Sequence, residues 1–169
     1  SSFQDIAEVK TGEWYKLDIS INGTSAACYL NGVLVNTLTI GEIDLSAATL
    51  AKFGSARNGA GLFYNGKASN FKIFNTALTA AQVADLYNNP EKVVPTGLES
   101  NLKLWLPMME GAGTTAYDGS GNGNHGTISG ATYVNGIGAP VAQSAVMDWN
   151  KGSNIFLYSE DITNAVWLA

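Results

Sequence analysis

Apolar residues recur at every second position along several stretches of the chain. Residues 13–21 alternate in this way, and the apolar side chains that share one face of the expected strand are Tyr15, Leu17, Ile19 and Ile21. Residues 71–74 and 102–106 show the same alternation. Because one apolar face is typical of a strand that packs on a core, we expect these faces to point inward.

Two local signals predict how the strands are connected. Asn31-Gly32 stands between two apolar runs and predicts a tight hairpin turn, since both residues accept positive φ. Thr79, followed three residues later by Gln82, predicts a capping box at the start of a helix over residues 79–88. Pro90 lies just beyond the expected end of this helix.

Two pieces of the chain resemble the laminin-G-like family of concanavalin A-like lectin and glucanase domains. The first piece carries Glu13-Trp14-Tyr15, residues 29–35 and residues 65–87, and in the family such residues lie in the second half of the domain. The second piece carries residues 102–107 and 110–127, which resemble the opening of such a domain. The resemblance implies an all-β fold, an antiparallel β-sandwich of jelly-roll type with one short helix near residues 79–88.

The order of these pieces predicts four parts. They are the C-terminal part of a laminin-G-like sandwich (1–93), a connector (94–101), strands like the opening of such a unit (102–150) and the start of a further β segment (151–169). The second piece either adds strands to the first sandwich or begins another unit. A half sandwich would expose sheet edges and an apolar face, which favours packing of the two pieces together.

The C-terminal segment carries a further resemblance. Residues 136–143, 148–154 and 158–161 look like junctions in bacteriophage tail and head-fibre proteins, where a laminin-G-like unit is followed by another β-domain. This resemblance implies a place on a virion surface.

Composition narrows the classes of partner. The chain of 169 residues has a net charge of −5 and a pI of about 4.7, so it lacks the basic surface that nucleic acid or anionic membranes require. No apolar run approaches the ~20 residues that cross a bilayer, so we expect no membrane insertion. Cys28 is the single cysteine, stands in an apolar run and is expected to act as a small buried hydrophobe.

The segment Asp118-Gly119-Ser120-Gly121-Asn122 is the best candidate for a metal site. Oxygen ligands at alternate positions with glycines between them suit calcium, and the candidate ligands are Asp118, Ser120 and Asn122. An EF-hand would need Glu at position 129, where the chain has Ser129, so a complete EF-hand is excluded. Two interpretations stay open: a looser calcium site, which the resemblance to laminin-G-like domains also implies, or a glycine turn in which Asp118 binds backbone amides.

The aromatic residues suggest where a sugar could stack. The candidates beside Asn- and Gly-rich loops are Tyr64, Tyr117 and, in the loop before Tyr64, Asn58. Trp14 and Trp105 stand in alternating strands and are expected in the core, and His125, the single histidine, is expected to be a turn residue. No strand carries the paired carboxylates that a glycosidase needs, which argues against an enzyme.

We therefore expect a non-enzymatic structural and adhesion module, extracellular or on a virion surface, that meets cell-surface glycans and forms homo-oligomers or assembles with other subunits. The first alternative is a purely structural assembly module of a capsid or tail without a sugar ligand. The second is a module associated with a glycoside hydrolase or lyase.

Overall fold

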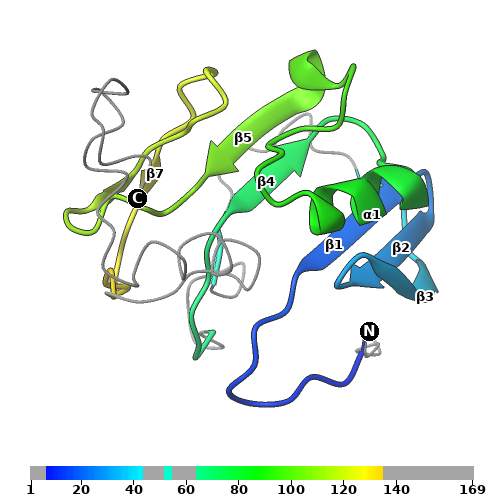
Figure 1. Ribbon diagram of the computed structural model, residues 1–169, viewed down its shortest axis with the longest axis horizontal. Helices are drawn as coiled ribbons and strands as arrows, with labels where there is room; N and C mark the ends of the chain where they lie inside the picture. The colour runs from blue at the N-terminus through cyan, green and yellow to red at the C-terminus, as the bar shows by residue number, and fades with distance from the viewer. Residues whose placement is uncertain (1–6, 44–51, 55–63, 135–169) are drawn as a thin grey trace, which may run out of the picture.

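The computed structural model describes residues 7–43, 52–54 and 64–134. Within this part of the chain all strands pair antiparallel, and the single α-helix is short (Figure 1). The fold is thus all-β, as the sequence predicts. The described strands form one three-stranded sheet and two two-stranded sheets.

The three-stranded sheet consists of β1 (Leu17–Asn22), β2 (Ser25–Leu30) and β3 (Val33–Thr39), with β2 in the centre. The turn between β2 and β3 has φ of 51° at Asn31 and 80° at Gly32, which confirms the predicted hairpin. Cys28 lies in the central strand and is fully buried, as expected for a thiol in an apolar run.

The apolar face of β1 is exposed, and the expectation that it points into a core is wrong for the described residues. Leu17, Ile19 and Ile21 share one face of β1 and are 52%, 49% and 40% exposed. Cys28 lies opposite Ile19 on the same face and is covered, so exposure grows toward the β1 edge. Alternation identifies residues that share a face, whereas burial depends on a second layer, and no described segment provides one over β1.

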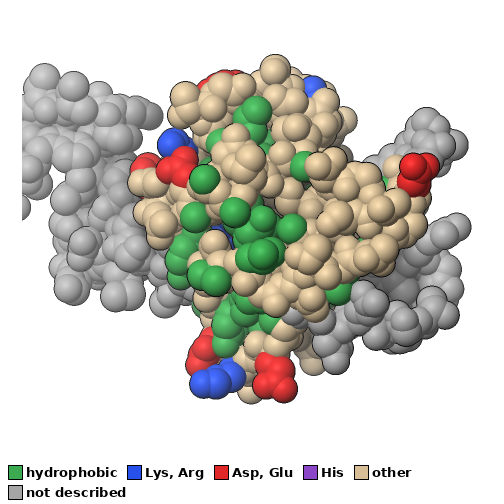
Figure 2. All heavy atoms as spheres, turned by 90° about the vertical axis from the view of Figure 1, so that its right-hand side faces the viewer, with side chains coloured by type: hydrophobic (Ala, Val, Ile, Leu, Met, Phe, Trp, Pro, Cys, Tyr) green, Lys and Arg blue, Asp and Glu red, His purple; other side chains and the backbone are tan. Residues whose placement is uncertain are grey.

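A second exposed apolar region lies at the β2–β3 hairpin. Figure 2 faces the side of the molecule where β2 and β3 lie in Figure 1, and hydrophobic side chains gather at its centre. The first residues of β3 are all exposed: Val33, Leu34 and Val35.

The helix α1 (Ala80–Asn88) lies over the other face of this sheet (Figure 1). Its buried residues are Val83 and Leu86. The Ser20 hydroxyl donates to the carbonyl oxygen of Leu78 at 2.7 Å and fixes the chain just before the helix. At the hairpin, a Cβ on Gly32 would lie 2.9 Å from the Cβ of Tyr87, so glycine permits the close approach of helix and turn.

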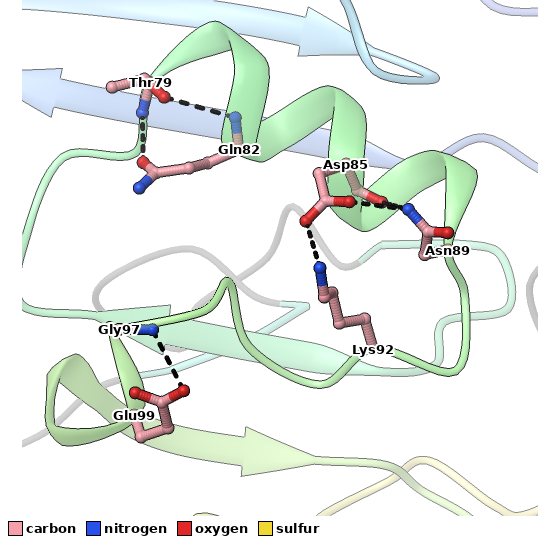
Figure 3. Close-up of polar contacts among 7 residues, drawn as sticks. All are labelled: Thr79, Gln82, Asp85, Asn89, Lys92, Gly97 and Glu99. Atoms are coloured by element: carbon pink, nitrogen blue, oxygen red, sulfur yellow. Dashed lines mark hydrogen bonds and ion pairs between the residues drawn. The ribbon is translucent and has the colours of Figure 1, made fainter.

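The ends of α1 are held by side chains (Figure 3). The Gln82 N–H donates to Thr79 Oγ1 at 3.3 Å, and the Thr79 N–H donates to Gln82 Oε1 at 2.9 Å, which confirms the predicted capping box. Past the other end, the Lys92 ammonium pairs with Asp85 at 2.7 Å. The helix therefore begins and ends where the sequence predicts.

The residues after the helix fold back to bring the two pieces together. Pro95 is fully buried, and a 3₁₀ turn, η1 (Glu99–Asn101), leads into β5 (Leu102–Leu106). β5 pairs antiparallel with β4 (Phe71–Phe74), with Phe71 opposite Leu106. The first strand of the second piece thus lies in one sheet with the last described strand of the first piece. The division into four parts stays a prediction.

The smallest sheet pairs β6 (Thr115–Ala116) with β7 (Gly126–Thr127). The glycine-dense segment between these two strands forms the turn that contains Asp118. Residues 131–134, the last of the described residues, form no strand. The last residues of the predicted part 102–150 and the whole predicted β segment at 151–169 lie outside the described residues.

Candidate functional site

Asp118 is the centre of the turn between β6 and β7, and the residue is buried, with 8% exposed. One carboxylate oxygen, Oδ1, accepts hydrogen bonds from the backbone N–H groups of Trp105 and Ser120, both at 2.9 Å. The other oxygen, Oδ2, accepts from the Asn124 N–H at 2.9 Å. A single carboxylate therefore ties both ends of the turn to β5.

Burial and hydrogen bonding shift the pKa of Asp118 in opposite directions. Burial alone would raise the pKa of this carboxyl, because it disfavours the charged form. Hydrogen bonds from the Ser120 hydroxyl and from three backbone N–H groups outweigh burial and lower the pKa to about 2. The group therefore stays ionised at every ordinary pH.

The amide side chains of the turn also face β5. Asn122 Nδ2 donates to the Leu102 carbonyl oxygen at 2.9 Å, and Asn124 Nδ2 donates to the Lys103 carbonyl oxygen at 2.9 Å. A Cβ on Gly119 would lie 2.6 Å from Cε3 of Trp105, so the backbone of the turn rests directly on the indole. The turn is thus built onto β5 by polar contacts and one close approach.

This arrangement has the geometry of a hydrogen-bonded turn. Both Asp118 oxygens already accept N–H donors, and Asn122 presents its NH₂ group to β5. Among the described residues, no group of three or more His, Cys, Asp or Glu side chains could hold a metal ion. Calcium at Asp118, Ser120 and Asn122 stays a prediction, and a cation there would have to replace these donors.

Tyr117 precedes Asp118 and points outward, with 58% of the residue exposed. Its ring meets the ring of His125, also exposed, edge to face, with 5.4 Å between the ring centroids and 72° between the planes. The Tyr117 N–H donates to Glu110 Oε1 at 2.7 Å. The Tyr117 backbone is therefore fixed by a hydrogen bond, while its aromatic ring is exposed at the surface.

Glu110 links the Tyr117 backbone to Tyr133 through its two carboxylate oxygens. Its second oxygen, Oε2, accepts from the Tyr133 hydroxyl at 2.8 Å, and that hydroxyl also contacts the Thr115 carbonyl oxygen at 3.1 Å. Burial would raise the pKa of Glu110, but the bonds from Tyr117 and Tyr133 lower it. The sequence did not indicate Glu110 or Tyr133 as site residues. Glu110 lies seven positions from Tyr117 and 23 positions from Tyr133, and contacts over such distances leave no local sequence signal.

Tyr64, the other sequence candidate, is 60% exposed but less free than Tyr117. Its hydroxyl donates to the Lys67 carbonyl oxygen at 3.2 Å, and a Cβ on Gly66 would lie 2.6 Å from the ring. The ring therefore lies against its own loop. Among the described residues no hydrogen bond or ring contact joins Tyr64 to Tyr117, and Asn58 lies outside this part of the chain.

The two tryptophans expected in the core are half-buried. Trp105 Nε1 donates to Asn70 Oδ1 at 2.8 Å, and the Lys72 ammonium lies 6.0 Å from the centroid of its ring. Burial, followed by the charge of Lys16, lowers the pKa of Lys72 to about 8. Trp105 thus supports the Asp118 turn, and neither tryptophan is an open aromatic platform.

Comparison with known proteins identifies the class of the first piece. Residues 1–84 match the family described as the concanavalin A-like lectin/glucanases superfamily, a laminin-G type. The all-β fold of this piece is therefore of the concanavalin A-like class. No curated protein matches the chain.

One similar solved structure is a crystal structure of an S-layer domain-containing protein from Clostridium thermocellum, 21% identical in sequence, with a TM-score of 0.41. The match covers 48% of this chain and 42% of that one, so this chain spans less than half of that structure. None of these matches supports the phage resemblance of the C-terminal segment. No described helix is both long and apolar enough to span a membrane.

Proposed function

We propose that this chain is a non-enzymatic adhesion module that binds cell-surface glycans through Tyr117. The observation that carries the proposal is the exposed Tyr117–His125 ring pair on a turn fixed by Asp118 and Glu110. A rigid scaffold with a binding residue on a surface loop is the usual arrangement for recognition. A tyrosine ring supplies apolar area for a sugar face at low entropy cost.

The match of residues 1–84 to a lectin and glucanase superfamily supports a carbohydrate ligand without selecting one. Folds of this class occur in enzymes too, so the non-enzymatic assignment depends on the strands that the structure describes, none of which carries paired carboxylates. An extracellular setting accords with glycan binding. The virion setting depends only on the resemblance of the C-terminal segment.

Binding to a glycan array tests the proposal. Tyr117→Ala should weaken binding by about tenfold or more, because loss of a central aromatic anchor costs ~1–2 kcal/mol or more. Tyr64→Ala is the matched control, since Tyr64 is equally exposed but lies against its own loop. Absence of binding to every glycan, or equal loss in both variants, would contradict the assignment to Tyr117.

A second candidate function is assembly with other copies or subunits. The exposed apolar face of β1, formed by Leu17, Ile19 and Ile21, favours this role. Large contiguous apolar patches on a protein surface often mark sites of protein association. Among the described strands β1 also lies at the edge of its sheet, and edge strands offer unpaired backbone groups to a partner.

Sedimentation velocity tests the assembly role. Ile19→Asp should shift the chain from oligomer to monomer, because a carboxylate on an apolar interface is costly to desolvate. Thr37→Asp is the control, since Thr37 is exposed and lies on β3 away from Ile19. A wild-type chain that sediments as a monomer at all concentrations would contradict self-assembly and leave glycan binding untouched.

A further inference from the structure

His125 is the ring next to Tyr117, and its two nitrogens are not equivalent. Nδ1 accepts a hydrogen bond from the backbone N–H of Asp118 at 3.0 Å. A backbone N–H can only donate, so Nδ1 must carry a lone pair. In a neutral imidazole one nitrogen is protonated and the other is not, and the proton of His125 therefore sits on Nε2.

The ring is held in this orientation. Rotation of the imidazole by 180° would place a carbon against the Asp118 N–H and leave that donor without its acceptor. The edge-to-face contact with Tyr117 restrains the ring from the side. His125 is exposed, and no hydrogen bond to Nε2 occurs among the described residues. The Nε2–H is thus a fixed donor at the surface, beside an exposed aromatic ring.

We propose that His125 is a ligand-contacting residue of the Tyr117 surface, whose Nε2–H donates to an oxygen of a sugar that stacks on Tyr117. The inference rests on the proposed function. It adds a specific hydrogen-bond donor, the His125 Nε2–H, and a ligand class. One apolar face and one hydrogen-bond donor at its edge match a pyranose ring, which has an apolar face and hydroxyl oxygens around its rim.

The charges around the pair select neutral sugars. Asp118 follows Tyr117 directly, and Glu110 accepts the Tyr117 N–H, so two carboxylates flank this backbone. Hydrogen bonds lower the pKa of both groups, so both are charged at neutral pH. A sialic or uronic acid would bring a third negative charge to the same surface. The ligand class is therefore a neutral, hydroxyl-bearing saccharide.

The first experiment determines, without any ligand, which imidazole nitrogen of His125 carries the proton. Nitrogen–proton correlation spectra of the ¹⁵N-labelled chain contain one imidazole, since His125 is the single histidine. At a pH where the ring is neutral, we expect the proton on Nε2 and an unprotonated Nδ1. The opposite tautomer, or fast exchange between both, would overturn the inference whatever the chain binds.

The second experiment removes the donor alone. Replacing His125 by histidine methylated at Nε2 keeps the Nδ1 acceptor and the ring and blocks only the outward N–H. The probes are methyl glycosides of glucose, galactose, mannose and N-acetylglucosamine, with methyl glucuronide as the acidic comparison. We expect the methylated chain to bind its best neutral glycoside about tenfold more weakly, the effect of one lost hydrogen bond.

The Asp118 amide proton is the control for the turn, because its exchange rate stays unchanged while Nδ1 accepts it. Undiminished binding by the methylated chain, with loss of binding in Tyr117→Ala, overturns the role of His125 and leaves the proposed function standing. Stronger binding of the glucuronide than of every neutral glycoside overturns the ligand class. Absence of binding to every probe and every array glycan overturns the proposed function, and the inference falls with it.

Discussion

The β1–β3 sheet with its helix and the Asp118 turn are both well-defined, but different forces hold them. The sheet and α1 bury apolar side chains, and Val83, Leu86 and Cys28 are almost wholly covered. The turn buries little apolar area and instead closes around one carboxylate that accepts three backbone N–H groups. Hydrophobic contacts are insensitive to pH, whereas a hydrogen-bonded carboxylate loses its acceptor capacity when it is protonated.

The difference also separates the two candidate functions. The apolar region leaves β1 side chains exposed, which suits association with another protein surface. The polar region presents a single aromatic pair on a braced turn, which suits a small polar ligand. The two proposed surfaces therefore lie on separate elements, and each can be altered alone.

The largest expected effect is on the β1–β3 sheet and α1, which are held by buried apolar side chains. Leu86→Ala should destabilise the chain by about 3 kcal/mol, the cost of a buried leucine side chain and the cavity it leaves. Urea unfolding at pH 3 and pH 7 should give the same loss, because no charge is involved. A loss that changes strongly with pH would contradict the division between the two regions.

Asp118→Asn should destabilise the chain by about 2 kcal/mol at pH 7, since the amide presents an NH₂ group to one of three N–H donors. The folded pKa of about 2 lies below the usual value of 3.8, so Asp118 contributes stability above about pH 4. That contribution is lost as the pH falls toward 2. The difference between wild type and variant in urea unfolding should accordingly shrink from pH 5 to pH 2.

Thr79→Ala removes the helix cap and should cost about 1 kcal/mol. We expect the effect to be confined to α1 and the β1–β3 sheet, because α1 covers this sheet. Hydrogen exchange should rise for the amides of α1 and its sheet and stay unchanged at Asn124, whose N–H is held by Asp118. Equal increases in both regions would show that the two open as one unit.

Calcium should have the smallest effect. Because the Asp118 oxygens already accept backbone donors, we expect millimolar calcium to leave the melting temperature unchanged. A rise in melting temperature that Asp118→Asn abolishes would place calcium at this turn after all.

The sequence predicts those features whose cause lies within a few residues. The Thr79–Gln82 capping box and the positive φ angles of Asn31 and Gly32 are local, and both are confirmed. The pairing of β4 with β5 joins residues about 30 positions apart, and the sequence could only offer it as one of two alternatives. Non-local pairing depends on which segments meet, which periodicity does not encode.

The candidate site was only partly predictable for the same reason. Tyr117 stands out as an aromatic residue beside a glycine-rich loop, and the structure exposes it. His125 is a turn residue as expected, but its hydrogen bond to Asp118 reaches across seven positions and fixes a tautomer that no motif indicates. The exposure of Ile19 could not be predicted, because alternation carries no information about the layer above it.

Cys28 gives the chain its own reporter of strand separation. It is the single thiol, it is fully buried, and it lies in the middle of the three-stranded sheet. A thiol reagent can reach its sulfur only when β2 parts from a neighbour or a covering side chain moves aside. The rate at which a thiol reagent labels the folded chain therefore measures how often such openings occur. A second subunit bound at β1 should lower that rate.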